Sequence, residues 1–481
     1  MSFISIKESN KRVISIAVSH LIQAIFIVIK IKFLTNFFSI SAYAQFAILL
    51  SSMSTSVALA RGGVDFLLTK KLMRGQSRPD YLPKYLSRLM VVVSFVIFLS
   101  LLFQIFLYYF FLTNINESAI VLLVCLSFII INSSNIVLLA IYKGLDEISI
   151  YAKGYLIGSI TNSIAQCLLV WHYGDSGILL IIIGSALAQL LIQIILFTRV
   201  SKKYNLNIIK NIKDIKNIKL SYLKSGTIIA LAKSYTAAIG MMSQFILILS
   251  LNYLSQEIAS AAYYLYTGLI GQASNLILIA VSGAFFPSLL RALQKGKLIF
   301  RDQIFSQTRV INAVSFPLFL LLLVFQENLI LLISNDSYML ESNLFTYMLC
   351  AAFLAASKQS FELSLYCHHS NKYFLSLSTI SNFLIIVIPF CMLYFFGING
   401  FGIGLLVHSI LIYILILIAS SIIYKFSILN LDMLIILINI LSFLLISLNL
   451  HLFKNNIIFI FIMLSIINFV YELFYSNKQA N

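Results

Sequence analysis

Three lysines lie inside apolar stretches of this chain, where a charged side chain is difficult to bury. Lys30, Lys233 and Lys358 each lie in a long run of apolar residues. A charged side chain is costly in such a setting unless it meets water, an anion or a partner of opposite charge. Glu362 follows Lys358 by four residues, the spacing of an ion pair on one helix face. We therefore expect two lysines able to bind an anion and one neutralised pair.

Lys30 belongs to a polar stripe on the first apolar run. With about 100° per residue, His20, Gln23 and Lys30 fall within roughly 80° on one helix face. Lys32 points about 200° away from Lys30, so the two cannot face one cavity. We expect Lys30 and Gln23 to face a polar cavity within the protein. We expect Lys32 to anchor its helix at the membrane interface. The alternative for Lys30 is a side chain that extends to the outer interface.

Lys233 lies in another apolar run. The helix face on which it lies carries mostly small residues. Gly226, Ala230, Ala237, Gly240 and Gln244 recur at helical spacing with it. Small residues on one face also allow two helices to pack closely, which is the alternative interpretation. A lysine on that face favours a water-filled cavity, and we expect Lys233 and Gln244 to line it.

Other polar residues are secondary candidates. Arg61 ends the second run on the predicted cytoplasmic side and either binds an anionic group there or anchors the helix. Gln272 and Asn275 share a face of the eighth run with Gly268 and Ser282. They could hydrogen-bond a polar ligand in a cavity or polar groups of neighbouring helices. Beyond a simple neutralised pair, Glu362 with Lys358 could form a proton or sodium site whose occupancy biases the equilibrium between two conformations.

The sequence offers little for catalytic, metal or nucleotide chemistry. The five cysteines have no paired spacing, and His368 and His369 have no acidic or cysteine partner nearby. No glycine-rich GK[ST] loop is present, so the chain lacks that route to ATP binding. We expect neither a cofactor, a metal nor an enzymatic activity.

Composition requires these residues to lie on membrane helices. The chain has 481 residues, of which 60% are hydrophobic and 10% charged, and its mean hydropathy is +0.99. Runs of about twenty apolar residues must cross the bilayer as helices. The sequence predicts fourteen spans, at about 13–38, 42–60, 87–112, 118–141, 151–172, 176–198, 225–250, 258–286, 310–334, 343–366, 373–396, 398–424, 431–451 and 455–475.

The net charge of +17 indicates orientation. With the N-terminus inside, nearly all lysines and arginines fall in cytoplasmic segments, and the outer loops contain only Lys454. We therefore expect both termini in the cytoplasm, contacts with anionic membrane lipids and no binding of nucleic acid.

Two turn motifs recur along the chain. Asn36-Phe37-Phe38-Ser39 returns as Asn252-Tyr253-Leu254-Ser255, and Tyr173-Gly174-Asp175-Ser176-Gly177 returns as Phe396-Gly397-Ile398-Asn399-Gly400. Each copy lies between two apolar runs. A duplicated unit of six spans is typical of transporters, whose halves move around a central site.

The repeat predicts an all-α polytopic membrane protein with two lobes. The N-terminal six-helix lobe covers 1–198, a basic cytoplasmic linker covers 199–224, and the C-terminal six-helix lobe covers 225–425. Residues 426–481 form an additional pair of spans. Because each half has an even number of spans, the halves should be parallel repeats about an axis normal to the membrane. Lys30 and Lys233 are then equivalent residues of the two lobes.

The chain resembles polysaccharide flippases of the O-antigen (Wzx) type, in the multidrug/oligosaccharidyl-lipid/polysaccharide exporter superfamily. The segments that carry this resemblance are 33–44, Leu59-Ala60-Arg61-Gly62-Gly63, Phe285-Phe286-Pro287-Ser288-Leu289 and the two aromatic-Gly-x-x-Gly turns. It covers residues 1 to about 425. The chain departs from the family in lacking Arg-Leu-Gly near the end of the first span, and its fourteen spans exceed the twelve of many members.

The resemblance implies a V-shaped bundle around a cationic cavity in the bacterial inner membrane. It also implies a substrate, an oligosaccharide on undecaprenyl pyrophosphate that moves from the inner to the outer leaflet. Lys30, Lys233 and Arg61 would contact the pyrophosphate. A glycan polymerase and a chain-length regulator are candidate protein partners in lipopolysaccharide biosynthesis.

Two other functions remain open on the sequence. A cation-coupled exporter of drugs or small metabolites from the same superfamily would share the fold, but it would favour carboxylates in its cavity. A membrane glycan polymerase or transferase would carry a large outer loop, whereas the predicted outer loops here are short.

Overall fold

The computed structural model describes residues 6–75, 82–113, 118–204, 220–255, 257–334, 338, 343–367, 371–424 and 431–448. These residues are helical apart from short turns, so the all-α prediction is confirmed. The fourteenth predicted span and the His368–His369 pair lie outside the described residues, as does most of the basic linker.

The chain divides into two compact units, Met1–Leu249 and Ser250–Asn481. Unit 1 contains α1 (Ile6–Phe37), α2 (Ile40–Gly75), α3 (Leu82–Leu107), the π-helix η2 (Tyr108–Leu112), α4 (Ala119–Gly144), α5 (Ile148–Tyr173), the 3-10 turn η3 (Gly174–Gly177), α6 (Ile178–Lys203) and most of α7 (Leu220–Leu254). Unit 2 contains α8 (Glu257–Lys295), α9 (Lys297–Val324), α10 (Gln326–Ile333), α11 (Leu344–Ser357), α12 (Gln359–Cys367), α13 (Asn371–Tyr424) and α14 (Leu431–Leu448).

The division of the chain falls within α7. One packing contact of α7 inside unit 1 joins Phe245 to Phe111 of η2, edge to face, with ring centroids 5.9 Å apart. The predicted lobe boundaries, which place α7 with the second half, stay a prediction.

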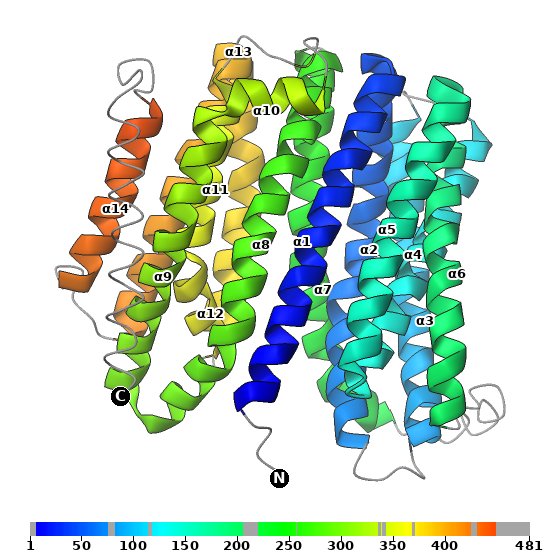
Figure 1. The fold of residues 1–481 in the computed structure, drawn as a ribbon, viewed down its shortest axis with the longest axis horizontal. Helices are drawn as coiled ribbons and strands as arrows, with labels where there is room; N and C mark the ends of the chain where they lie inside the picture. The colour runs from blue at the N-terminus through cyan, green and yellow to red at the C-terminus, as the bar shows by residue number, and fades with distance from the viewer. Residues whose placement is uncertain are drawn as a thin grey trace. The chain divides into compact units, whose positions relative to one another are not determined.

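Seven helical segments among the described residues are long and apolar enough to cross a membrane. Two of them, 149–203 and 376–424, each cover two predicted spans joined by a tight turn. The protein is therefore a multi-pass membrane protein (Figure 1).

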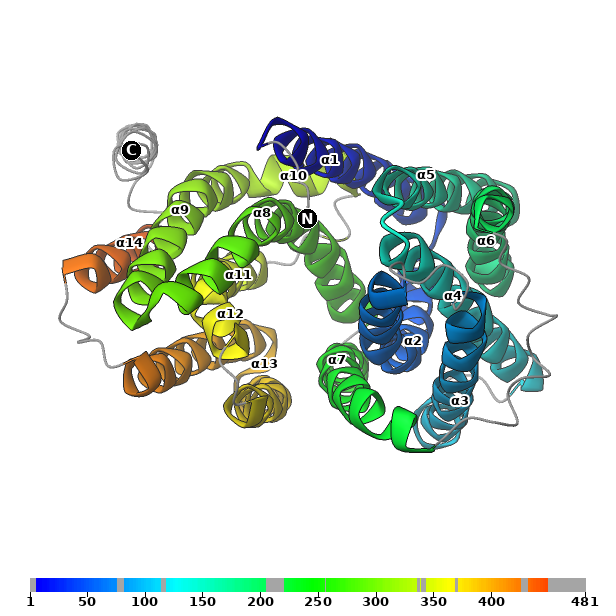
Figure 2. The same ribbon diagram turned by 90° about the horizontal axis from the view of Figure 1, so that it is seen from below.

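Unit 1 is held together by close helix packing and by buried polar bonds. In the end-on view of Figure 2, α2 lies beside α3 and α4, as their contacts confirm. A Cβ on Gly144 would lie 2.8 Å from Leu72 Cβ, so α4 approaches α2 too closely for a larger residue. Ser56 donates a 2.8 Å hydrogen bond to Gln104 across α2 and α3. Small residues and interhelical hydrogen bonds are what stabilise helix pairs where lipid, not water, surrounds them.

Unit 2 has an aromatic core that attaches the last described helix. Phe443 of α14 stacks on Phe353 of α11 with ring centroids 4.1 Å apart and packs edge to face on Phe316 of α9. The predicted helix pair that follows the repeat is therefore joined to the second unit through its first member.

The duplicated turns share one backbone conformation. Gly174 has φ 52° and ψ −140°, and Gly397 has φ 66° and ψ −153°. At this combination glycine is the ordinary residue, because a side chain would clash with its own backbone. Three residues further on, a Cβ on Gly177 or Gly400 would meet the Cβ of the aromatic residue four positions before it. The sequence repeat therefore corresponds to a structural repeat of the hairpin turn.

Two predicted spans are broken in the structure. The predicted span 310–334 divides at Phe325 into α9 and the short α10, which turns away from α9 (Figure 1). With 28 residues at 1.5 Å each, α9 already reaches about 42 Å, enough to cross a bilayer before Phe325. The predicted span 343–366 divides at Lys358 into α11 and α12.

Candidate functional site

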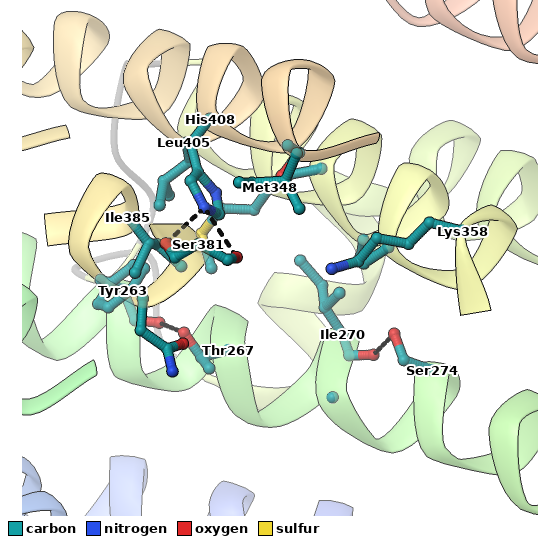
Figure 3. A pocket seen from close by; sticks show the side chains of 17 residues that line it. Tyr263, Thr267, Ile270, Ser274, Met348, Lys358, Ser381, Ile385, Leu405 and His408 are labelled. Atoms are coloured by element: carbon teal, nitrogen blue, oxygen red, sulfur yellow. Dashed lines mark hydrogen bonds between the residues drawn. The ribbon is translucent and has the colours of Figure 1, made fainter. Parts of the chain in front are cut away.

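A cavity of about 420 Å³ lies within unit 2 between α8, α11 and both arms of α13 (Figure 3). This volume falls within the range of about 300–1,000 Å³ that is typical of small-molecule sites. The turn at Gly397 folds the two arms of α13 against each other, so that Ser381 and His408 reach the same wall. The hairpin thereby positions one side of the cavity.

The α11 wall creates the space. Met348, Ala351, Ala352, Ala355 and Lys358 follow one another at helical spacing along the face that lines the cavity. Three of these five side chains are single methyl groups, which leave the volume unfilled. Ala355 lines the cavity and is exposed. Lys358, at the end of the face, extends its side chain inward (Figure 3).

The α8 wall supplies hydroxyl groups. Thr267 donates its hydroxyl to the carbonyl of Tyr263 at 2.7 Å, and Ser274 donates to the carbonyl of Ile270 at 2.9 Å. Both hydroxyls therefore satisfy their donor within the helix. Their oxygens stay available to accept hydrogen bonds from a molecule in the cavity.

The α13 wall carries a buried histidine. His408 is 6% exposed, and its Nε2 lies 3.1 Å from the carbonyl of Ser381 and 3.5 Å from the Ser381 hydroxyl. Because a carbonyl only accepts, Nε2 carries the proton in this contact. The bond joins the two arms of α13 and fixes the imidazole ring. Asn382 and Ser409 add an amide and a hydroxyl to the same wall.

Lys358 and Glu362 form the ion pair that their spacing predicted. Lys358 Nζ lies 3.5 Å from Glu362 Oε2, and their side chains are 19% and 32% exposed. Glu362 lines a second cavity of about 130 Å³, which Lys358, Ser381 and Asn382 also line. Lys358 therefore stands between the two cavities, with its partner in the smaller one. The role of the pair in ion coupling stays a prediction.

The first-span candidates lie in unit 1. Lys30 is half-buried on α1, which packs along α5. Gln23 is half-buried as well, whereas Lys32 is exposed. This separation matches the opposite faces expected of Lys30 and Lys32. Contact of Lys30 or Gln23 with a substrate stays a prediction.

The other predicted site residues lie on three different helices, α2, α7 and α8. Arg61 is exposed at the middle of the long helix α2, while Gln244 of α7 and Gln272 of α8 are half-buried. Gln272 is next to Gly271 in sequence, but only Gly271 lines the cavity. The side chains of Lys233 and Asn275 lie outside the described residues. The structure thus brings Lys358 and Glu362 together and leaves the other assignments open.

Polar residues of the fifth span bond to the sixth. Asn162 donates to Gln189 at 3.4 Å, and Gln166 donates to Ser185 at 3.1 Å. Interhelical hydrogen bonds therefore account for the amide side chains of Asn162 and Gln166 in the structure. Within the described part of the chain, no group of three or more histidine, cysteine or acidic side chains could hold a metal.

Sequence reasoning missed His408, Ser381 and Asn382. His408 is an ionisable residue in an apolar run, the same signal that drew attention to Lys233. Ser381 and Asn382 give no periodic pattern of their own. Their proximity to His408 depends on the hairpin turn, which brings residues 27 positions apart into contact.

Comparison with known proteins identifies the fold. No family model and no curated protein matches the sequence. Among solved structures, the lipid II flippase MurJ in an inward closed conformation aligns with a TM-score of 0.64 at 13% identity, covering 96% of this chain and 99% of that chain. An inward-facing MATE family multidrug transporter of the MOP superfamily aligns with a TM-score of 0.59 at 13% identity, covering 85% and 99%. A MATE transporter in complex with MaD3S aligns at 0.57, with 12% identity.

The chain has the fold of the MOP-superfamily transporters. The MurJ alignment extends over almost the full length of both chains, so the likeness concerns the whole architecture rather than one helical hairpin. These neighbours are a multidrug transporter and a lipid II flippase.

Proposed function

We propose that the protein is a flippase that moves oligosaccharides linked to undecaprenyl pyrophosphate from the inner to the outer leaflet of the bacterial inner membrane. This proposal rests on the MOP-type fold combined with the charge of the larger cavity. Among the described residues that line this cavity, the charged group is a lysine and not a carboxylate. The solved structure that aligns over 96% of this chain is itself a lipid flippase. The resemblance to Wzx-type proteins supports the O-antigen class of substrate.

The proposed mechanism is alternating access. The pyrophosphate and glycan enter a water-filled path lined by fixed positive charges, while the polyprenyl tail stays in lipid. Lys30, Lys233 and Arg61 contact the pyrophosphate, and helices bend at Pro287 and Pro317 and at the glycines Gly62-Gly63 and Gly283. With both termini in the cytoplasm, outward movement of one negative charge gains about 2.3 kcal/mol per 100 mV of membrane potential.

Coupling to an ion gradient is assigned to the pair of Lys358 and Glu362. Uptake of a proton or sodium ion by Glu362 would leave Lys358 without its partner at 3.5 Å. An unpaired lysine would favour the state in which an anion reaches it, so occupancy of Glu362 would bias the conformational equilibrium.

The second candidate is a cation-coupled exporter of drugs or small metabolites, which the alignment with MATE transporters supports. Such an exporter needs a site that favours positively charged or neutral drugs. The larger cavity of unit 2 presents Lys358 and neutral groups among its described lining residues, a composition that favours anions or hydroxyl-rich molecules. A membrane glycan polymerase or transferase is the weaker alternative.

Deletion of the gene and complementation with variants tests the proposal in cells. Cells without the protein should accumulate complete lipid-linked units inside and lose surface glycan. Lys233→Ala should fail to restore display at a normal protein level, whereas Lys32→Ala, on the exposed face of α1, should restore it. Normal display in cells lacking the protein would refute the flippase function, and normal display with Lys233→Ala would refute the role of that lysine.

A further inference from the structure

The larger cavity of unit 2 has the chemical composition of a binding site for a charged sugar. Its polar lining among the described residues consists of hydroxyls, one amide, one histidine held by Ser381, and one lysine. A bare metal ion does not need a cavity of about 420 Å³, and a drug cation would gain nothing from Lys358. Hydroxyl and amide groups around a single positive charge suit a ring that carries hydroxyls and one negative group.

We propose that this cavity binds one acidic sugar residue of the oligosaccharide and that Lys358 pairs with its carboxylate in place of Glu362. The inference rests on the proposed function, because it names the kind of sugar that the flippase transports. It adds a site in unit 2 that recognises the glycan, separate from the residues assigned to the pyrophosphate.

Glu362 is the carboxylate that occupies Lys358 when the cavity is empty. Glu362 lies 3.5 Å from Lys358 and lines the smaller cavity but not the larger one, which Lys358 also lines. Exchange of one carboxylate for another keeps the charge of Lys358 balanced, so binding of the sugar does not itself leave the lysine without a partner. Glu362 is 32% exposed, and the smaller cavity borders it, so its released carboxylate can be hydrated.

The other walls supply partners for the sugar hydroxyls. Thr267 and Ser274 direct their own protons to α8 carbonyls, which leaves them as acceptors of hydrogen bonds from the sugar. Ser409 and Asn382 line the opposite wall and carry donor groups. A pyranose ring has hydroxyls that both donate and accept, so the two walls complement it.

The α11 wall sets the size of the ligand. Ala355 is exposed to the cavity one helical turn before Lys358, and a larger side chain there would occupy the space next to the lysine. A phenylalanine at this position projects into an open volume, not into packed neighbours. It should therefore block the site without disrupting the fold.

Binding of D-glucuronate and D-glucose to the full-length protein in nanodiscs tests the proposal by isothermal titration. We expect glucuronate to bind at least about tenfold more tightly than glucose, the discrimination that a hydrogen-bonded charge provides. Lys358→Gln should remove this preference, Lys358→Arg should retain most of it, and Ala355→Phe should abolish binding of both sugars. Glu362→Gln should tighten glucuronate binding severalfold, because the competing carboxylate is gone.

Three outcomes would overturn the proposal. The first is equal affinity for the two sugars, and the second is a preference for glucuronate that survives Lys358→Gln. The third is inorganic pyrophosphate binding more tightly than glucuronate with the same dependence on Lys358, which would make the cavity a phosphate site.

A flipping assay with acidic and neutral lipid-linked oligosaccharides separates this inference from the proposed function. If Lys358→Gln slows both substrates equally, the acidic-sugar site is refuted while the flippase function stands. If the wild-type protein moves neither substrate but binds glucuronate in a Lys358-dependent manner, the flippase function is refuted and the site stands.

Discussion

Replacement of Gly397 by alanine tests whether the duplicated turn depends on glycine for conformation alone. Gly397 has φ 66° and ψ −153°, and a Cβ there would meet no atom within 4 Å. The cost of alanine therefore comes only from the backbone, about 1–3 kcal/mol for a residue held in a region that is essentially restricted to glycine. The expected result is a loss of that size in the free energy of unfolding.

Gly271 provides a matched control. A Cβ at Gly271 also meets no atom within 4 Å, but this glycine lies inside the helix α8. Alanine should stabilise a helix interior by up to about 1 kcal/mol relative to glycine. The two substitutions add the same methyl group to open space, so they should change stability in opposite directions. Gly174→Ala should behave like Gly397→Ala, because its Cβ makes only an ordinary contact of 3.9 Å with the Phe37 carbonyl.

Equilibrium unfolding in mixed micelles, with sodium dodecyl sulfate as denaturant and circular dichroism as readout, measures these differences. If Gly397→Ala and Gly271→Ala shift the unfolding free energy equally, the backbone argument is refuted. The equivalence of the two turns would also fail if Gly174→Ala were neutral while Gly397→Ala was costly.

Three further predictions concern other contacts. Gly404→Ala should destabilise the protein by about 1–3 kcal/mol or more in the same unfolding assay. The reason is that its Cβ would lie 2.7 Å from Pro389 Cα in the opposing arm of α13. A neutral result would contradict that close approach. Asp175→Ala should cost about 0.5–2 kcal/mol by removing the acceptor of the 2.8 Å bond from the Ser39 N–H at the start of α2, whereas Asp175→Asn retains an acceptor and should cost less. Burial alone would raise the pKa of Glu147, but hydrogen bonds from Lys203 and Tyr204 outweigh it and hold the pKa below its ordinary value of 4.5. With a lowered pKa, ionised Glu147 stabilises the folded state above about pH 4.5, and this stabilisation is lost as the pH falls. The wild-type protein should therefore melt at a higher temperature than Tyr204→Phe at about pH 6, and this difference should shrink towards about pH 3.5. A constant difference across that range would exclude this linkage.

The sequence predicted the helical architecture and the repeated turns because both depend on local signals. Apolar runs of membrane length specify helices, and the recurrence of Gly174 as Gly397 marked the positions where the backbone takes a positive φ. The four-residue spacing of Lys358 and Glu362 likewise sufficed to predict their ion pair. Each of these features is determined by residues that are close to one another in the sequence.

The cavity depended on long-range packing and could not be derived in the same way. Alanines on α11 leave an open volume only because α8 and the two arms of α13 surround them. Ser381 meets His408 only through the hairpin at Gly397. The break at Phe325 was missed even though Gln326, Glu327 and Asn328 interrupt the apolar run directly after it, where α9 already has the length to cross the membrane.

Transport of a fluorescent undecaprenyl-pyrophosphate oligosaccharide by the purified protein in liposomes tests the central claim most directly. A reductant that cannot cross the bilayer quenches only the label in the outer leaflet, so movement between leaflets appears as an increase in the quenched fraction. We expect rapid movement with the wild-type protein and little above protein-free liposomes with Lys233→Ala. No movement by a folded wild-type protein, with and without an imposed ion gradient or membrane potential, would contradict it.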